Sequence, residues 1–193
     1  MRIGVFGGTF DPPHVGHLLL AADAFEALRL DKLIFVPASI QPFKVGTPAV
    51  ASPTDRLEMV RLSAGDDPRY SVDDAEIGRE GLSYTVDTLE DLSRRNRREE
   101  IFLLVGEDAL AGFAGWRNRE RILELATLAV MHRAGTSGSE KKSVVHDGVV
   151  SLSARRIDVS STEIRERVRT GKSIKGFVAE PVERFIRARG LYR

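Results

Sequence analysis

The sequence contains no cysteine among its 193 residues, and this absence excludes disulfide bonds and thiolate metal sites. It also lacks long apolar runs, since no stretch approaches the roughly 20 residues that a membrane-spanning helix needs. The first residues, MRIGVFGG, contain an apolar run that is too short for the core of a secretory signal peptide. We therefore expect a cytoplasmic protein with no membrane partner.

The chain has little net charge, with a formal value of +1, although 30% of its residues are charged and 42% are hydrophobic. This composition is typical of a folded globular protein. The charge is uneven, because residues 155–193 carry eleven Lys/Arg against five Asp/Glu. A basic C-terminal segment favours an anionic ligand, and an ordinary solvated helical surface explains it equally well. The arginines form no stripe that would indicate a nucleic-acid partner.

Short apolar segments alternate with helical patterns along the chain. Strands are predicted at 2–6, 32–36, 69–73, 101–105 and 127–131, and helices at 15–30, 54–64, 83–95 and 117–125. This alternation predicts right-handed βαβ units and an α/β fold, a Rossmann-like doubly wound parallel sheet. In such sheets ligands bind at the carboxyl ends of the strands, near the point where the strand order reverses.

Two more helices are predicted in a small C-terminal helical segment. Ser160 and Glu163 fit a capping box at the start of the first, and Gly171 suits its end. Pro181 suits the first position of the second helix. Without a linker signal or an internal repeat, we expect a single domain over 1–193, with 155–193 as its C-terminal helical subregion.

The run GGTFDPPHVGH, residues 7–17, follows the first predicted strand and opens the first helix. Its two histidines, His14 and His17, fit four interpretations: metal ligands, an acid–base pair, phosphate contacts or ordinary helix-start residues. The spacing places both imidazoles on one helix face. However, no acidic residue accompanies them, and the pattern is not HExxH, so the motif lacks the third strong ligand of a metal site.

Phosphate binding fits this run better than metal binding. Gly7 and Gly8 let the backbone approach a ligand closely, and Thr9 offers a hydroxyl. The helix start directs free N–H groups and the positive end of its dipole toward the strand ends. Gly16 removes bulk between the two imidazoles. The turn contains neither GxxxxGK[ST] nor GxGxxG, so it is not one of the common phosphate loops.

The run resembles the signature of the nucleotidyltransferases marked by an HxGH motif, and within them the bacterial nicotinate-nucleotide adenylyltransferases. Further segments agree in the expected order over nearly the whole chain: VPASIQPFK (36–44), GLSYTVDTLEDL (81–92), LLVGEDALAGFAGWRNRERILELATLAVMHR (103–133), VSSTEIRERVRTG (159–171) and VERFIRARGLY (182–192). One departure concerns the loop after the second strand, which often reads PHK in this family. Here Phe43 replaces the histidine and Lys44 is kept.

The resemblance implies adenylyl transfer from ATP to nicotinate mononucleotide, which gives deamido-NAD and pyrophosphate in NAD biosynthesis. The attacking phosphate is already ionised at pH 7, so it needs alignment and charge neutralisation rather than a general base. Mg²⁺ would arrive on the ATP phosphates, and no metal ligand is expected from the protein. The catalytic residues implied in this way are His14, His17, Lys44 and Arg165.

The resemblance also implies two sets of binding residues. Those for ATP are Gly8, Thr9, Phe10, His14, His17, Gly106, Asp108, Ser160, Ser161, Thr162 and Arg165. Those for nicotinate mononucleotide are Gly7, Gly8, Lys44, Ser83, Tyr84, Thr85 and Trp116. The backbone amides of Tyr84 and Thr85 would receive the nicotinate carboxylate, and Trp116 would stack on the pyridine ring. Without the resemblance, a lone tryptophan is more often a core residue.

Other functions stay open at this point. A related transferase would use phosphopantetheine, glycerol phosphate or nicotinamide mononucleotide, although the first two types lack the SYT and GxDxLxxFxxW segments. A tRNA synthetase also carries an HxGH-like motif, but 193 residues leave no anticodon domain. A protein of another class, a nucleotide-sensing module without catalysis, would not need His14, His17, Lys44 and Arg165 together. The oligomeric state is open, and a homo-oligomer is compatible with the sequence.

Overall fold

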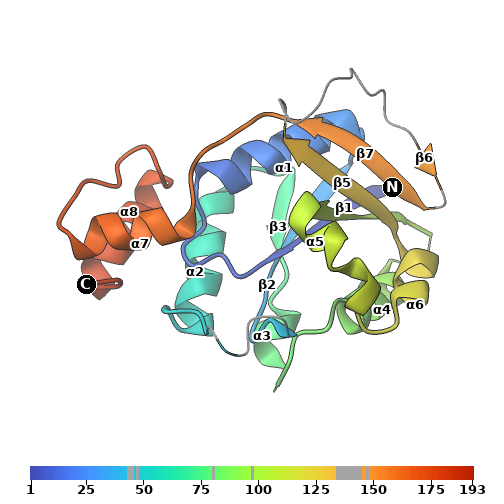
Figure 1. Cartoon of the computed structure of the whole chain (residues 1–193), viewed down its shortest axis with the longest axis horizontal. Coiled ribbons are helices and arrows are strands. Elements are labelled where there is room, and N and C mark those ends of the chain that lie inside the picture. The colour runs from blue at the N-terminus through green and yellow to red at the C-terminus, as the bar shows by residue number, and fades with distance from the viewer. Residues whose placement is uncertain (43–45, 47, 80, 97, 134–144, 147) are drawn as a thin grey trace.

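The structure is a computed structural model that describes residues 1–42, 46, 48–79, 81–96, 98–133, 145–146 and 148–193. Within these residues seven strands form one sheet in the order β3-β2-β1-β4-β5-β7-β6 (Figure 1). They are β1 (Arg2–Gly8), β2 (Lys32–Pro37), β3 (Tyr70–Val72), β4 (Glu100–Gly106), β5 (Thr127–Arg133), β6 (Val145–His146) and β7 (Val149–Ala154). Every neighbouring pair is parallel except β6 with β7. The predicted parallel sheet is confirmed.

Helices cover both faces of this sheet. They are α1 (Val15–Ala27), α2 (Pro53–Ala64), α3 (Ala75–Gly78), α4 (Thr85–Arg95), α5 (Glu107–Ala111), α6 (Arg119–Leu125), α7 (Ser161–Arg169) and α8 (Glu180–Arg189), with a 3-10 turn η2 (Phe113–Gly115). Alternate strand residues face opposite ways, so Phe102 and Leu104 pack with α1, whereas Ile101 and Leu103 pack with α4 and α6. The fold is therefore doubly wound. In the described part of the chain, no helix combines the length and apolar character needed to cross a membrane.

Local sequence signals set several helix ends. Ser52 and Ser160 cap α2 and α7 because each side-chain oxygen accepts a backbone N–H three residues later, at 3.1 Å. Gly171, with φ +70°, follows α7 as predicted. The prediction that the first helix reaches Leu30 is wrong. The helix ends at Ala27 because Arg29 takes a left-handed conformation, with φ +48°, that turns the chain toward β2.

Three predicted helix starts need correction. The helix expected over 83–95 begins at Thr85, the helix expected over 117–125 begins at Arg119, and Pro181 is the second rather than the first residue of α8. The strand VVSLSA was missed, although it forms β7 and pairs in parallel with β5. Its mixture of serine and apolar residues lacks the apolar run of the other strands, so it gives a weak local signal.

The strand order reverses between β1 and β4. From β1 the chain builds β2 and β3 on one side, and it then returns to place β4, β5 and β7 on the other side. Phe6 pairs with Leu104, so the carboxyl ends of β1 and β4 lie side by side. The segments that follow them leave toward opposite faces, as α1 and as α5 to α6. A ligand site is expected in the crevice between such diverging connections.

The two C-terminal helices pack away from the sheet. Figure 1 shows α7 and α8 together at one end of the molecule, next to α2 and opposite β6. They share an apolar cluster with that helix and with the last residues of the chain; its buried members include Met59, Ile164, Ile174, Val182, Ile186 and Tyr192. The C-terminal subregion therefore anchors on α2, and its first turn reaches the carboxyl end of β1.

Candidate active site

The two histidines of the HxGH motif form a stacked pair at the start of α1. Their ring centroids lie 3.7 Å apart, with 30° between the ring planes. The backbone N–H of His14 donates a hydrogen bond to Nδ1 of His17 at 3.1 Å. Because Nδ1 of a neutral His17 accepts, its proton resides on Nε2. His17 therefore holds a defined tautomer, in which Nε2 carries the one N–H donor of the ring.

Both imidazoles are neutral in the free protein at pH 7. Burial lowers the pKa of His14 from 6.5 to about 4. Burial also lowers the pKa of His17 well below its ordinary value, and the neighbouring His14 adds to this effect. A polyanionic ligand beside the rings would favour their charged forms and raise both pKa values. The pair is thus suited to donate hydrogen bonds to an anion and to take up positive charge when the anion binds.

The glycines of this motif make room for its own rings. A Cβ on Gly16 would lie 2.9 Å from Nδ1 of His14, and a Cβ on Gly8 would lie 2.9 Å from Cζ of Phe10. The space predicted beside Gly16 is therefore filled by the His14 imidazole. Gly8 leaves room for the Phe10 ring. The backbone of Phe10 is in the left-handed region, with φ +49°. A Cβ on Gly7 would meet nothing closer than the Val36 carbonyl oxygen at 4.0 Å, so Gly7 alone leaves open backbone.

The start of α1 offers fewer free amides than the sequence suggested. The Val15 N–H donates to the carbonyl oxygen of Phe177 at 2.8 Å, and the His17 N–H donates to that of His14 at 2.9 Å. A helix start normally leaves its first N–H groups without backbone partners. Here the carbonyl oxygen of Phe177 accepts one of them, so the Gly16 N–H and the two imidazoles are the donors that remain at this helix start.

Buried charged residues hold the loop between β1 and α1 in place. The Asp11 carboxylate accepts hydrogen bonds from the N–H groups of Val50 and Ala51, at 2.7 and 3.1 Å, and from the Tyr192 hydroxyl at 2.8 Å. On the other side of the loop, the buried Arg56 guanidinium donates to the carbonyl oxygens of Thr9, Ala38 and Ser39 at 2.6–3.0 Å. No local pattern in the sequence indicates this supporting role for Asp11, Arg56 or Tyr192.

The first turn of α7 docks on the same loop. The Ser161 hydroxyl donates to the Pro12 carbonyl oxygen at 2.8 Å, and Nη1 of Arg165 donates to the Asp11 carbonyl oxygen at 2.7 Å. Nη2 of Arg165 donates to the Thr162 hydroxyl at 3.1 Å. The fold thus brings Ser161, Thr162 and Arg165 to the histidine motif from about 150 residues away. Part of the donor capacity of Arg165 serves the loop itself.

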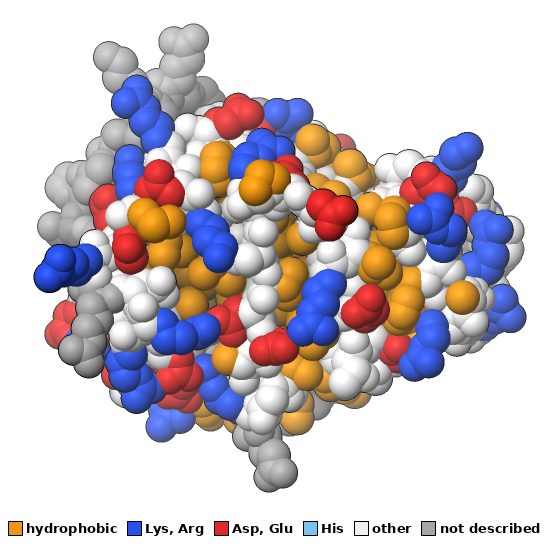
Figure 2. Space-filling view, turned by 180° about the vertical axis from the view of Figure 1, so that it is seen from behind, with side chains coloured by type: hydrophobic (Ala, Val, Ile, Leu, Met, Phe, Trp, Pro, Cys, Tyr) orange, Lys and Arg blue, Asp and Glu red, His pale blue; other side chains and the backbone are white. Residues whose placement is uncertain are grey.

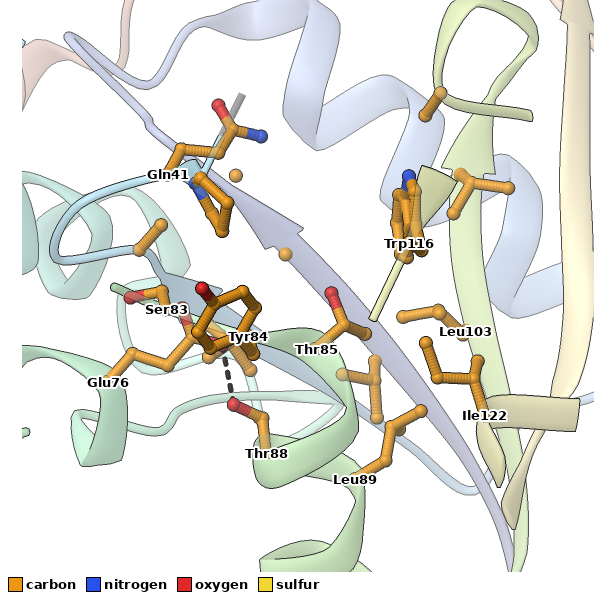
Figure 3. A pocket seen from close by; sticks show the side chains of 18 of the residues that line it. Gln41, Glu76, Ser83, Tyr84, Thr85, Thr88, Leu89, Leu103, Trp116 and Ile122 are labelled. Carbon is orange, nitrogen blue, oxygen red and sulfur yellow. Dashed lines mark hydrogen bonds between the residues drawn. The ribbon is translucent and has the colours of Figure 1, made fainter. Parts of the chain in front are cut away.

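A cavity of about 460 Å³ lies at the reversal of strand order, between the end of β1, the end of β4 and the start of α4. Its lining includes these residues named from the sequence: Gly7, Gly8, Ser83, Tyr84, Thr85, Gly106 and Trp116. Figure 3 shows Trp116 across the cavity from Ser83 and Tyr84, with Thr85 between them. The residues expected to bind the mononucleotide, apart from Lys44, therefore surround one cavity.

The start of α4 faces this cavity without a side-chain cap. Tyr84 is the N-cap residue and makes no capping hydrogen bond. The Ser83 hydroxyl accepts the Ser39 N–H at 2.9 Å, which ties this helix start to the loop after β2. An uncapped helix start carries partial positive charge and available N–H groups. It is suited to receive a carboxylate, as the sequence suggested for Tyr84 and Thr85.

Lys44 and Asp108 were also predicted for the site. Lys44, with its neighbour Phe43, lies outside the described residues. Asp108 is exposed on α5 just beyond β4, at the same edge of the sheet but not among the cavity-lining residues. Two charged residues in the cavity lining, Glu76 and Arg117, were not predicted from the sequence. Oε1 of Glu76 accepts a hydrogen bond from the Thr88 hydroxyl at 2.6 Å. Burial raises the pKa of Glu76.

Within the described residues, no group of three or more His, Cys, Asp or Glu side chains is placed to hold a metal ion. Asp11, the carboxylate nearest in sequence to the histidines, already accepts three hydrogen bonds from the protein.

On the face in Figure 2, Lys/Arg and Asp/Glu side chains are interspersed rather than gathered into a stripe of one sign.

Comparison with known proteins places this site in a family. A family model described as cytidylyltransferase-like matches residues 5–167. A probable nicotinate-nucleotide adenylyltransferase of Gemmatimonas aurantiaca is 47% identical, over all of this chain and 93% of that protein. The chain belongs to the nicotinate-nucleotide adenylyltransferase family. Another member, of Thermus thermophilus, is 43% identical over the full length of both chains. The family resemblance drawn from the motifs is confirmed.

Solved structures agree on the fold of this family member. A Plasmodium falciparum nicotinic acid mononucleotide adenylyltransferase complexed with NaAD superposes with a TM-score of 0.74, at 15% identity, over 99% of this chain and 97% of that one. A putative nicotinate-nucleotide adenylyltransferase from Vibrio parahaemolyticus gives 0.70 at 21% identity, over 100% and 96% of the two chains. At these identities the likeness supports the Rossmann-like architecture alone.

Proposed function

We infer that this chain transfers the adenylyl group of ATP to nicotinate mononucleotide, giving deamido-NAD and pyrophosphate, a step of NAD biosynthesis. The observation that carries the inference is the junction of two sites at the end of β1. The stacked histidines and the start of α7 gather at the loop that follows β1. The cavity with Tyr84 and Trp116 is lined by Gly7 and Gly8 at the end of the same strand. Family membership supports the same reaction.

On the ATP side, hydrogen-bond donors and positive charge would surround the triphosphate. Nε2 of His17 would donate to the phosphate that bears the developing charge, and His14, stacked on it, would contribute next to it. Lys44 and Arg165 would add positive charge. Gly106 and Asp108, at the end of β4, would meet the adenosine. Gly8, Thr9, Phe10, Ser160, Ser161 and Thr162 would complete this ATP site.

On the acceptor side, the cavity would hold the pyridine ring. Trp116 would stack on the ring, and the uncapped start of α4 at Tyr84 and Thr85 would receive its carboxylate. Gly7 leaves the backbone open where the mononucleotide phosphate passes toward ATP. That phosphate oxygen attacks the α-phosphorus, a new P–O bond forms, and the bond to the β-phosphate oxygen breaks to release pyrophosphate.

Mg²⁺ would enter as part of the Mg-ATP substrate. It would neutralise charge on the triphosphate and on the departing pyrophosphate. The described residues fit this arrangement. No group of three or more His, Cys, Asp or Glu side chains among them could hold a metal ion, and both oxygens of Asp11 are engaged by Val50, Ala51 and Tyr192.

A direct assay tests the proposed function. The protein is mixed with Mg-ATP and either nicotinate mononucleotide or phosphopantetheine, and both pyrophosphate and the dinucleotide product are quantified. We expect equimolar deamido-NAD and pyrophosphate with the first acceptor and no turnover with the second. Turnover on phosphopantetheine alone would assign the chain to another transferase, and ATP binding without turnover on either acceptor would indicate a sensing module.

A further inference from the structure

Arg117 is the one lysine or arginine among the described residues that line the cavity. It directly follows Trp116, in the short connection between η2 and α6. Its guanidinium carbon lies 4.6 Å from the centre of the Tyr84 ring, over the ring face. The cation therefore sits beside the N-cap residue of α4, where the helix dipole is also positive.

The Arg117 charge is not balanced by a carboxylate within the described part of the chain. No Asp or Glu oxygen there lies within 4.0 Å of its guanidinium, whereas Arg119 pairs with Glu120 at 2.8 Å and Arg121 pairs with Glu124 at 2.8 Å. The lining holds one carboxyl group, Glu76, and that group accepts the Thr88 hydroxyl. An unbalanced cation on the wall of a largely apolar cavity suits an anionic group on the ligand.

Two groups of nicotinate mononucleotide are anionic, and their positions differ. The phosphate has to approach the histidines at the start of α1, because that is where ATP would be held. The pyridine ring would then occupy the far part of the cavity, between Trp116 and Tyr84, which face each other across it. The anion next to Arg117 would therefore be the ring carboxylate. Nicotinamide mononucleotide carries an uncharged amide at the same ring position and is otherwise identical.

We propose that Arg117 is a specificity-determining residue, whose guanidinium favours the acid mononucleotide over the amide. This proposal rests on the proposed function and deepens it. Arg117 is exposed in the free protein, so solvent and salt screen its charge. A charge-assisted hydrogen bond at such a site is worth about a tenfold preference, at the lower end of the range for ionised partners.

The test compares kcat/KM for the two mononucleotides at saturating Mg-ATP in the wild type, Arg117→Gln and Arg117→Lys. We expect Arg117→Gln to lower kcat/KM for the acid about tenfold and to leave the amide within about twofold, with an unchanged KM for ATP. Arg117→Lys should recover most of the preference because it keeps the charge. Arg119→Gln is the matched control, since it removes a nearby arginine that is already paired, and it should change neither substrate.

Equal losses on both mononucleotides would place Arg117 on the shared phosphate or in support of the ring, and would overturn the proposal. Unchanged kinetics in Arg117→Gln would overturn it as well. Calorimetric Kd values for the two mononucleotides, with and without Arg117→Gln, give the same comparison without turnover. A protein that binds the acid through Arg117 but makes no deamido-NAD would therefore contradict the proposed function while supporting this proposal.

Discussion

Replacing Gly16 by alanine should separate the stability of this protein from its activity. Gly16 is the second residue of α1, and alanine in place of glycine inside a helix stabilises by up to about 1 kcal/mol. The new Cβ would lie 2.9 Å from Nδ1 of His14 and 3.0 Å from Cε1. Since ordinary contacts begin at 3.4 Å, the His14 ring must retreat by about half an ångström.

The consequence falls on the stacked pair rather than on the fold. A shift of about 1 Å in a catalytic group costs about 10²-fold in rate, so half of that predicts about a tenfold loss of kcat/KM. We expect Gly16→Ala to keep or raise the melting temperature and to lose about tenfold in adenylyl transfer. Gly78→Ala is the matched control, because a Cβ there meets nothing within 4 Å. Full activity in Gly16→Ala would refute the idea that adenylyl transfer requires His14 to keep its present position.

Three further predictions concern the same framework. His17→Ala should lower kcat at least about 10²-fold in steady-state assays, because it removes a donor to transition-state charge; a change in the KM for ATP alone would instead indicate uniform binding. Tyr192→Phe should cost about 1–3 kcal/mol in urea unfolding, because the buried Asp11 carboxylate loses a donor; an unchanged midpoint would refute this anchor. Because His14 has a folded-state pKa of about 4 against 6.5 unfolded, its contribution is complete above pH 6.5. Roughly 3 kcal/mol of unfolding free energy should be lost as the pH falls toward 4, and His14→Asn should reduce this dependence to the part that His17 contributes.

The parts of the site that the sequence predicted are those with local signals. The turn from β1 into α1 combines glycines, prolines and histidines in eleven consecutive residues, and each has a physical reason to stand there. Ser160 similarly predicts the start of α7, because serine is a favoured N-cap residue. The apolar runs of β1, β2 and β4 predict buried parallel strands because both faces of the sheet are covered.

The residues that support the site could not be predicted in this way, because their partners are remote. Tyr192 bonds to Asp11 across 181 residues, and Arg56 bonds to the Thr9 carbonyl oxygen across 47. In the sequence Tyr192 resembles an ordinary terminal residue, and Arg56 resembles a solvated helix position. Only the packing of α2 and α8 beside the motif gives these side chains their roles. The carbonyl oxygen of Phe177 accepts the Val15 N–H, and no local sequence pattern predicts this contact because its two residues are also remote.

We infer that this chain makes deamido-NAD from ATP and nicotinate mononucleotide in a site built for an acid. The most direct test of this activity is the kcat/KM of the wild-type protein for nicotinate and nicotinamide mononucleotides, measured side by side with Mg-ATP and with chromatographic identification of the dinucleotide. We predict efficient formation of deamido-NAD and a preference for the acid of at least about tenfold. Equal or greater efficiency with the amide, or no dinucleotide from the acid, would contradict the account.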